Sequence, residues 1–331
     1  MQLGQLSSRV YTDIPRSLQP KDHVYGILGL HQEMTGSSSL ADYLSPNYKK
    51  PLHSIFRDAT KFLILEQQNL NVLNMIEKHF PGDSVDSSWP SWVPQWHASW
   101  DVENDADFFR EFCAGSFTQC NIHTAFNEKE PDQLILTGYA VHIVRGVAAV
   151  AKRKELRSFG GTQNIIQGIE NLITANSIER DHLILGKTLI IDTTHEGQAA
   201  TREECEDYLV WRNYMADTGD FPPRFRRLLI VGQEFDGQTL AASRYNRATL
   251  SGYGNRRFFI TASGSMGIGP KAMQAHDIIA VVYGCCWPVV LRPHGEHYKI
   301  FGPCYIHDIM EGEAMRKFQA EGKPEETFIV C

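Results

Sequence analysis

Short apolar runs, rich in β-branched and aromatic residues, fill the chain between residues 255 and 313 and are separated by glycine and proline. These runs occupy residues 257–261, 277–283, 288–291 and 298–310, the last of them broken at Pro303. Runs of this length and spacing predict an antiparallel β-meander. We therefore expect a compact, curled sheet near the C-terminus, with the helical remainder of the chain packed on it.

Helical periodicity appears in three earlier segments. Between residues 51 and 80, apolar side chains recur at spacings of three and four, which predicts a helix that begins near Pro51. The apolar piece at 70–76 fits either a short strand or a continuation of that helix. A second helix is expected over 163–175, with Thr162 as its N-cap. A third is expected over 202–215, because Thr201 followed by Glu204 forms a capping box.

The sequence pattern predicts strands in two further segments. Residues 134–151 are long, apolar and rich in valine and isoleucine, and residues 187–193 spell KTLIIDT. Helices and strands are mixed without βαβ alternation, which favours an α+β fold.

We expect a single domain over residues 1–331. Its parts are a mainly helical part with a tryptophan-rich segment (1–130), a mixed part (131–254), the β-meander (255–313) and a charged tail of unassigned role (314–331).

Composition narrows the class of protein. The 331 residues carry 32 basic and 39 acidic side chains, and the densest basic patch is short. The absence of a basic stripe argues against nucleic acid as a partner.

No apolar run approaches about 20 residues, so no membrane span is expected. Seven scattered cysteines without a CxxC motif, and an N-terminus without an apolar signal region, indicate a cytoplasmic protein in a reducing compartment. The oligomeric state stays open.

No motif calls for a cofactor. The glycine-rich loop at 264–269 has no following G-K-[ST], so we interpret it as a strand connection and not as a phosphate cradle. The H-G-E-H turn at 294–297 supplies too few ligands for zinc. Cys285 and Cys286 would point to opposite faces of a strand, which makes joint metal binding difficult. A G-x-S-x-G elbow is also missing, while a Cys–His nucleophile pair that meets only in space stays open.

Aromatic residues supply the first candidate binding wall. Four tryptophans lie within twelve residues, and Trp96 and Trp100 are one helical turn apart. Tryptophan buries a large apolar area but needs a partner for its N–H group. The segment is either a loop wedged into the core or one wall of a ligand pocket.

Polar candidates lie at the end of the meander. Strand alternation puts Tyr305 and His307 on one face, with Ile306 and Asp308 on the other. His307 is either a hydrogen-bond donor or general acid–base, or a histidine satisfied within a packed sheet. Arg292 forms either a buried structural ion pair or a contact that orients a substrate carboxylate or carbonyl.

Several blocks of sequence resemble fungal heterokaryon-incompatibility (HET)-like proteins. These blocks are K-D-H-V-Y-G-I-L-G-L at 21–30, W-P-S-W-V-P-Q-W at 89–96, R-R-F-F-x-T-x-x-G-x-x-G-x-G-P from Arg256, P-V-V-L-R-P from Pro288 and G-x-C-Y-I-H-D-I-M-x-G-E from Gly302. Their order and spacing match over most of the chain. The family's N-terminal core, with an L-S-Y-x-W-G type motif, would precede Lys21, and the twenty residues found there do not spell it.

The resemblance implies two functions. Stand-alone HET-like proteins without that core resemble biosynthetic enzymes of fungal natural-product pathways, including norbornene-forming Diels–Alder cyclases that act on terpenoid intermediates. We accordingly expect a cofactor-independent cyclase that binds a small apolar substrate and accelerates cyclisation by orientation and by hydrogen bonding to a carbonyl. Its expected pocket has catalytic His307 and Tyr305 and the substrate-binding residues Trp96, Trp100, Tyr283 and Arg292.

The alternative, which the family name implies, is a signalling or interaction module without catalysis. A cyclase predicts a deep aromatic pocket. An interaction module predicts an exposed apolar patch.

Overall fold

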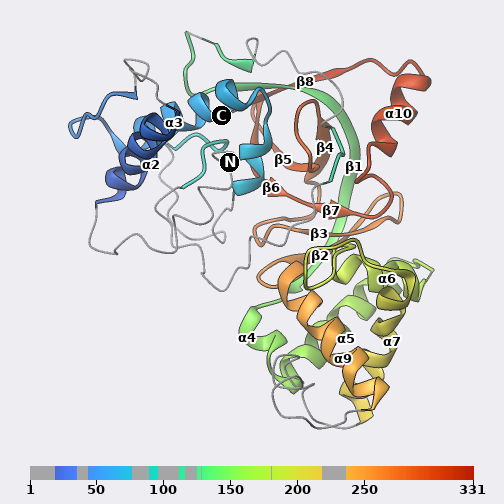
Figure 1. The fold of residues 1–331 in the computed structure, drawn as a ribbon. Coiled ribbons are helices and arrows are strands. Elements are labelled where there is room, and N and C mark those ends of the chain that lie inside the picture. Colours follow the sequence, from blue (N-terminus) through green and yellow to red (C-terminus); the bar gives the residue numbers. More distant parts are fainter. Residues whose placement is uncertain are drawn as a thin grey trace.

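A β-barrel flanked by two groups of helices forms the described part of the computed structural model (Figure 1). The structure describes residues 19–35, 44–76, 89–95, 112–115, 125–127, 129–179, 181–217 and 236–331. The helices are α2 (Pro20–Thr35), α3 (Leu52–Gln67), the 3₁₀ helix η2 (Asn71–Met75), α4 (Arg153–Leu156), α5 (Phe159–Ala175), α6 (His182–Leu189), α7 (Arg202–Asp217), α9 (Gly237–Gly252) and α10 (Glu313–Ala320). The strands are β1 (Leu134–Val150), β2 (Arg257–Thr261), β3 (Met266–Gly269), β4 (Ile278–Val282), β5 (Val289–His294), β6 (His297–Pro303), β7 (Tyr305–Ile306) and β8 (Glu326–Val330).

Five strands close the barrel. β4, β5 and β6 form consecutive antiparallel pairs, and β8 pairs antiparallel with the first residues of β1. A parallel bridge between Tyr298 and Val330 joins β6 to β8, and β1 pairs with β4 to complete the ring. The second half of β1 leaves the barrel and pairs with β2, which is followed by β3 and β7.

The long strand β1 therefore belongs to both sheets. Register shifts between Ala140 and His142, and between Val144 and Gly146, bend it on its way out of the barrel. Gly138 permits the closest approach to β4, because a Cβ there would lie 2.1 Å from the Val281 carbonyl oxygen. A glycine at this position lets β1 pass against β4 at the point where the barrel closes.

Three apolar clusters are formed by the residues that the structure describes. The first takes inward side chains from all five barrel strands and covers them with α2, α3, η2 and Trp92. In the second, α5, α6, α7 and α9 pack on Phe258, Ile260 and Ile268 of the β2–β3 hairpin. The third lies on the other face of β1, β4 and β5, and α10 covers part of it. The α5–α9 group thus forms a separate helical unit beside the β2–β3–β7 sheet, seen at the bottom of Figure 1.

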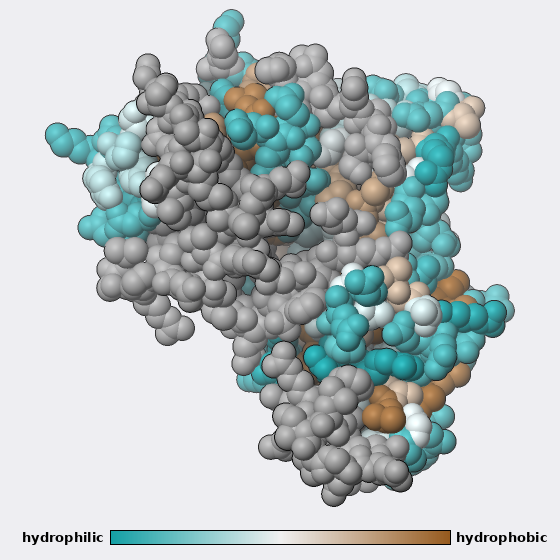
Figure 2. All heavy atoms as spheres, viewed as in Figure 1, coloured by the Kyte–Doolittle hydropathy of each residue, from teal (hydrophilic) through white to brown (hydrophobic). Residues whose placement is uncertain are grey.

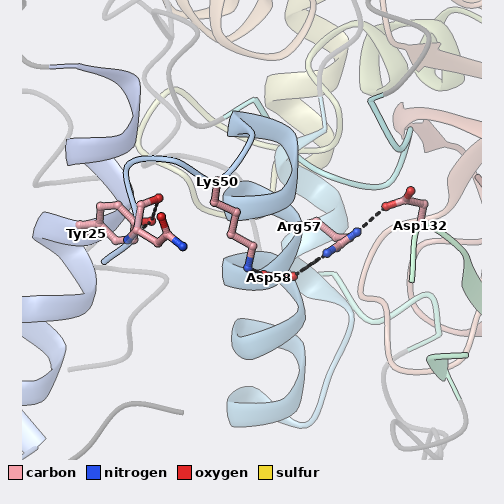
Figure 3. A network of polar contacts seen from close by, with 6 residues as sticks. Tyr25, Lys50, Arg57, Asp58 and Asp132 are labelled. Carbon is pink, nitrogen blue, oxygen red and sulfur yellow. Dashed lines mark hydrogen bonds and ion pairs between the residues drawn. The ribbon is translucent and has the colours of Figure 1, made fainter. Parts of the chain in front are cut away.

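Polar contacts attach α3 to the start of the barrel strand β1 and attach α2 to the loop before α3. Lys50 and Arg57 both contact the buried carboxylate of Asp58, and Arg57 also reaches Asp132, just before β1 (Figure 3). On α2, Lys21 donates to the carbonyl oxygens of Tyr48 and Lys50 at 2.6 and 2.8 Å.

Tyr25 and Asp22 of the same helix also hold this loop. The Tyr25 hydroxyl accepts from the Asn47 backbone N–H at 2.9 Å, and Asp22 accepts from the Tyr48 hydroxyl. Lys21, Asp22 and Tyr25 therefore hold the loop that leads into α3.

The expected α+β fold is confirmed, as is the capping box. The backbone N–H of Thr201 donates to Glu204 at 2.9 Å, and the backbone N–H of Glu204 donates to the Thr201 hydroxyl at 3.2 Å. Thr162 is not an N-cap. The helix begins at Phe159, and the Thr162 hydroxyl donates to the Leu156 carbonyl from inside it.

Two strand predictions need correction. Residues 187–193 are the end of α6 and a turn, because Asp181 caps a helix that continues to Leu189. Residues 255–313 do not form one continuous meander, because β3 pairs with β7 and β4 pairs with β1. The tail at 314–331 supplies most of α10 and all of β8, which closes the barrel.

Candidate functional site

His307 lies where the β2–β3–β7 sheet meets the helical unit. Its backbone N–H donates to the Met266 carbonyl of β3 at 3.2 Å, and α6 packs on the same strand. The ring Nε2 lies 3.0 Å from Asp308 Oδ1. The ring Nδ1 is buried and has no hydrogen-bond partner among the described residues.

Charged residues of α6, of its N-cap and of the turn after it are close enough to act electrostatically on this histidine. Lys187 lies 3.5 Å from Asp192, and both charges act on the His307 ring together with that of Asp181. Burial lowers the pKa of His307, and the proximity of Lys187 lowers it further, while the acidic neighbours oppose the shift. We call His307, Asp308, Lys187 and Asp192 the His307 junction.

The backbone has positive φ angles at Asp308, next to His307, and in the turn after α6. Asp308 has a φ of 71°, and the consecutive residues Ile191 and Asp192 have φ values of 50° and 53°. A β-branched residue rarely adopts positive φ, and such conformations persist only where the surrounding structure enforces them. The positive φ at Asp308 also brings its carboxylate to His307, so the expected placement of these side chains on opposite faces is wrong. β7 ends at Ile306, before strand alternation could apply.

A neutral His307 can act as a proton acceptor. If Nε2–H donates to Asp308, Nδ1 keeps a free lone pair in a buried environment. This arrangement suits either a general base or a hydrogen bond to a group that enters the His307 junction.

Tyr305 points away from solvent into the second cluster. Its side chain is 1% exposed, and its ring centroid lies 5.9 Å from that of Phe112. The backbone of Tyr305 is paired with Ile268 of β3. These contacts are those of a core residue.

Tyr283 lies on the α10 side of the barrel. Its hydroxyl donates to Glu325 at 2.6 Å and lies 3.4 Å from the Tyr139 hydroxyl. Burial and the hydrogen bond to Glu325 raise the pKa of Tyr283 far above its usual value. This contact ties the end of β4 to the segment that leads into β8.

Arg292 forms a buried ion pair. Its Nε and Nη2 donate to Asp277 at 2.7 and 2.9 Å, and Nη2 also donates to the Ala272 carbonyl at 2.9 Å. The guanidinium lies 3.8 Å from the centroid of the Phe301 ring. Among the described residues, no contact brings Arg292, Tyr283 and the His307 junction together.

The tryptophan-rich segment is described only at its start. Trp92 is fully buried and donates to the Asp132 carbonyl at 2.8 Å, and Trp89 donates to the Val93 carbonyl at 3.1 Å while packing edge-on against Phe56. Trp96 and Trp100 lie outside the described residues.

The remaining candidate ligands stay apart. Within the described part of the chain, no three histidine, cysteine or acidic side chains are grouped as a metal site would require. Cys285 and Cys286 lie in a turn and not in a strand, and both contact Asn74.

Lys187 and Asp192 were not among the predicted site residues, because the apolar pattern of residues 187–193 is also that of a strand. Asp181 was the available signal, since it precedes the apolar run as an N-cap.

Comparison with known proteins agrees with the resemblance. Residues 210–323 match the family model of the Het-6 beta-barrel domain. Heterokaryon incompatibility protein 6, OR allele, of Neurospora crassa is 22% identical over 341 aligned positions, which include 88% of this chain. Both matches support a HET-like protein. The chain spans about half (48%) of that relative's length, and no solved structure gives a significant match.

The family match adds a detail to the fold. It includes β2 to β7 and α10, whereas β1 and β8, which close the barrel, lie outside it. Among the described residues, no helix is long and apolar enough to cross a membrane.

Proposed function

We propose that this chain is a recognition module of the heterokaryon-incompatibility type, which acts by binding another protein. The observation that carries the proposal is the alignment of 88% of the chain with heterokaryon incompatibility protein 6. The alignment is longer than the Het-6 barrel segment at 210–323 and therefore includes residues outside that segment.

The geometry of the polar candidates supports binding over catalysis. Arg292 donates to Asp277, and the Tyr283 hydroxyl donates to Glu325. Tyr305 is buried in the core. Side chains engaged in this way stabilise the barrel and the helical unit as a rigid platform. A rigid platform presents a preformed surface, so fewer side chains and loops lose conformational entropy when a partner binds.

The exposed apolar residues are distributed over several elements. Leu209 of α7 and Leu240 of α9 are each 38% exposed on the helical unit, and Ile143 of β1 is 52% exposed. On the face shown in Figure 2, the described residues of that unit are mostly hydrophilic, with small separate hydrophobic groups between them. The exposed apolar patch expected of an interaction module is therefore not formed by these described residues. The contact surface in this proposal is instead a mixed, largely polar one.

An incompatibility assay tests the proposal. The chain is expressed in Neurospora crassa recipients that carry different alleles of heterokaryon incompatibility protein 6, and viable colonies are counted. A recognition module gives fewer colonies in one allelic background than in another.

A second candidate, the cofactor-independent cyclase, is favoured by the buried Nδ1 of His307. An unpaired acceptor in a buried site can accept a hydrogen bond from a substrate hydroxyl. A thermal-shift screen against apolar polyene metabolites tests it, because a ligand at 100 times its Kd adds about 2.7 kcal/mol of stability. The shift must be reduced in His307→Gln for this candidate to stand.

A further inference from the structure

Two adjacent cysteines occupy the turn between β4 and β5. Cys285 is fully buried, whereas Cys286 is half-buried. The backbone of the turn is fixed from one side, because Gly115 N–H donates to the Cys285 carbonyl at 3.0 Å and Ala114 N–H donates to the Cys286 carbonyl at 3.1 Å. The turn therefore holds the two thiols in a defined place.

One side-chain amide contacts both sulfur atoms. Asn74 Nδ2 donates to Cys286 Sγ at 3.0 Å, and Asn74 Oδ1 accepts from Cys285 Sγ at 3.6 Å. The neighbouring Asn71 accepts from the Cys286 backbone N–H at 2.9 Å. Both sulfurs are thus directed to the same group on η2, and not to opposite faces as in a strand.

This geometry gives the two thiols different roles. An N–H donor stabilises a thiolate, which is the form of cysteine that reacts with oxidants, and Cys286 is the more accessible of the pair. Burial raises the pKa of Cys285 far above its usual value, so Cys286 is the thiol that reacts with the oxidant first. Cys286 is suited to attack an oxidant, and Cys285 to resolve the product.

We propose that Cys285 and Cys286 form an oxidation site, at which a peroxide converts the pair into a disulfide between adjacent residues. The Cys286 thiolate attacks one peroxide oxygen and becomes a sulfenic acid, and the hydroxide released takes up the thiol proton as water. The Cys285 sulfur then attacks the Cys286 sulfur and displaces a second water, which carries the Cys285 proton. Two thiols and one hydrogen peroxide give one disulfide and two waters.

The disulfide would be easily reversed and would act on the structure nearby. Adjacent Cα atoms are about 3.8 Å apart, which is shorter than the usual spacing of about 4.4–6.8 Å in disulfides. Strained disulfides are readily reduced and are typical of regulatory sites. Oxidation also removes the Cys285 S–H group that donates to Asn74 Oδ1, so it weakens the contact of η2 with the β4–β5 loop.

Peptide mapping tests the proposal. The purified full chain is treated with hydrogen peroxide, alkylated and digested with trypsin. Cys285 and Cys286 fall in one peptide, residues 272–299, because Pro293 blocks cleavage after Arg292. Cys113 and Cys120 share a different peptide, residues 111–129. The expected product is peptide 272–299 without alkylation and two hydrogen masses lighter, and dithiothreitol restores both alkylation sites.

Three results would overturn the proposal: a cross-link between the two peptides, a sulfinic acid on Cys286 without any internal disulfide, or faster oxidation of Cys331 than of the pair. Cys286→Ser abolishes the product, whereas Cys331→Ser, at another half-buried thiol, leaves it unchanged. Asn74→Ala keeps both thiols and is expected to slow the reaction several-fold. An unchanged rate in that variant counts against the role of the shared amide.

Discussion

The carboxylate of Asp277 receives two hydrogen bonds from the guanidinium of Arg292, at 2.7 and 2.9 Å, from the neighbouring strand β5. Asp277 is 1% exposed and also accepts from the Gln274 backbone N–H at 2.8 Å. A buried charge satisfied in this way fixes the turn before β4 against β5, and its loss affects the barrel and not an exposed surface.

Removing the Arg292 side chain is expected to destabilise the protein strongly. Arg292→Met leaves the Asp277 carboxylate buried without its partner, which costs about 3 kcal/mol of unfolding free energy. Urea denaturation measures the loss. The matched control is Arg202→Met, in an exposed pair with Glu206, where stability should hardly change. Equal effects for the two variants would contradict the structural role of Arg292.

Glycine-to-alanine substitutions are expected to have opposite effects on stability in the barrel and in the helical unit. Gly138→Ala places a Cβ against the backbone of Val281 and Val282, so we expect a loss of about 3 kcal/mol. Gly168 lies in α5 with no atom within 4 Å of such a Cβ, and Gly168→Ala is expected to stabilise by about 0.5–1 kcal/mol. Thermal unfolding of both variants checks the opposite signs.

Disrupting the capping box at the start of α7 is expected to lower the free energy of unfolding by less than the Arg292 and Gly138 substitutions do. Thr201→Ala removes the acceptor for the Glu204 N–H and is expected to cost about 1 kcal/mol. Glu204→Gln should keep most of the stability, since glutamine can also accept from the Thr201 N–H. Chemical denaturation measures the stability of both variants. A Glu204→Gln variant that is less stable than the Thr201→Ala variant would be inconsistent with a capping box.

Stability is expected to fall on acidification. The folded-state pKa of His307 lies below the unfolded value of about 6.5, so the unfolded chain takes up the proton first. The favourable contribution of the neutral histidine is present above that pH and is lost as the pH falls towards the folded-state pKa.

The pH effect can be assigned to one residue. Between about pH 7 and pH 5, His307→Asn should lower the dependence of unfolding free energy on pH by at most about 1.4 kcal/mol per unit, the value for one proton. His142 and His195 also have pKa values lowered by burial, so part of the slope remains. An unchanged slope in the variant would show that His307 binds its proton equally well in both states.

Local chemistry explains which parts of the fold could be predicted. The capping box at Thr201 and Glu204 depends on residues three apart, and the strands at 257–261 and 277–283 carry their own apolar pattern and flanking glycines. The apolar pattern around Lys187 alone fits a helix or a strand equally well, and the N-cap Asp181 is the local feature that favours the helix.

Long-range pairing explains what could not be predicted. β1 and β8 are separated by 175 residues between Val150 and Glu326, yet together they close the barrel, and no local pattern encodes that pairing. The same holds for the His307 junction, because the charges of Lys187 and Asp192 act on His307 only when α6 packs on β3. Asn74 and Cys286 likewise meet across 212 positions of sequence.

The central claim, recognition through protein contact, is tested most directly by colony counts after transformation of Neurospora crassa recipients that differ in their allele of heterokaryon incompatibility protein 6. We predict a reduced count in one allelic background, retained by the Gly168→Ala chain and abolished by the barrel-disrupting Gly138→Ala chain. Equal counts in every background, with the expressed chain confirmed in the cells, would contradict the claim.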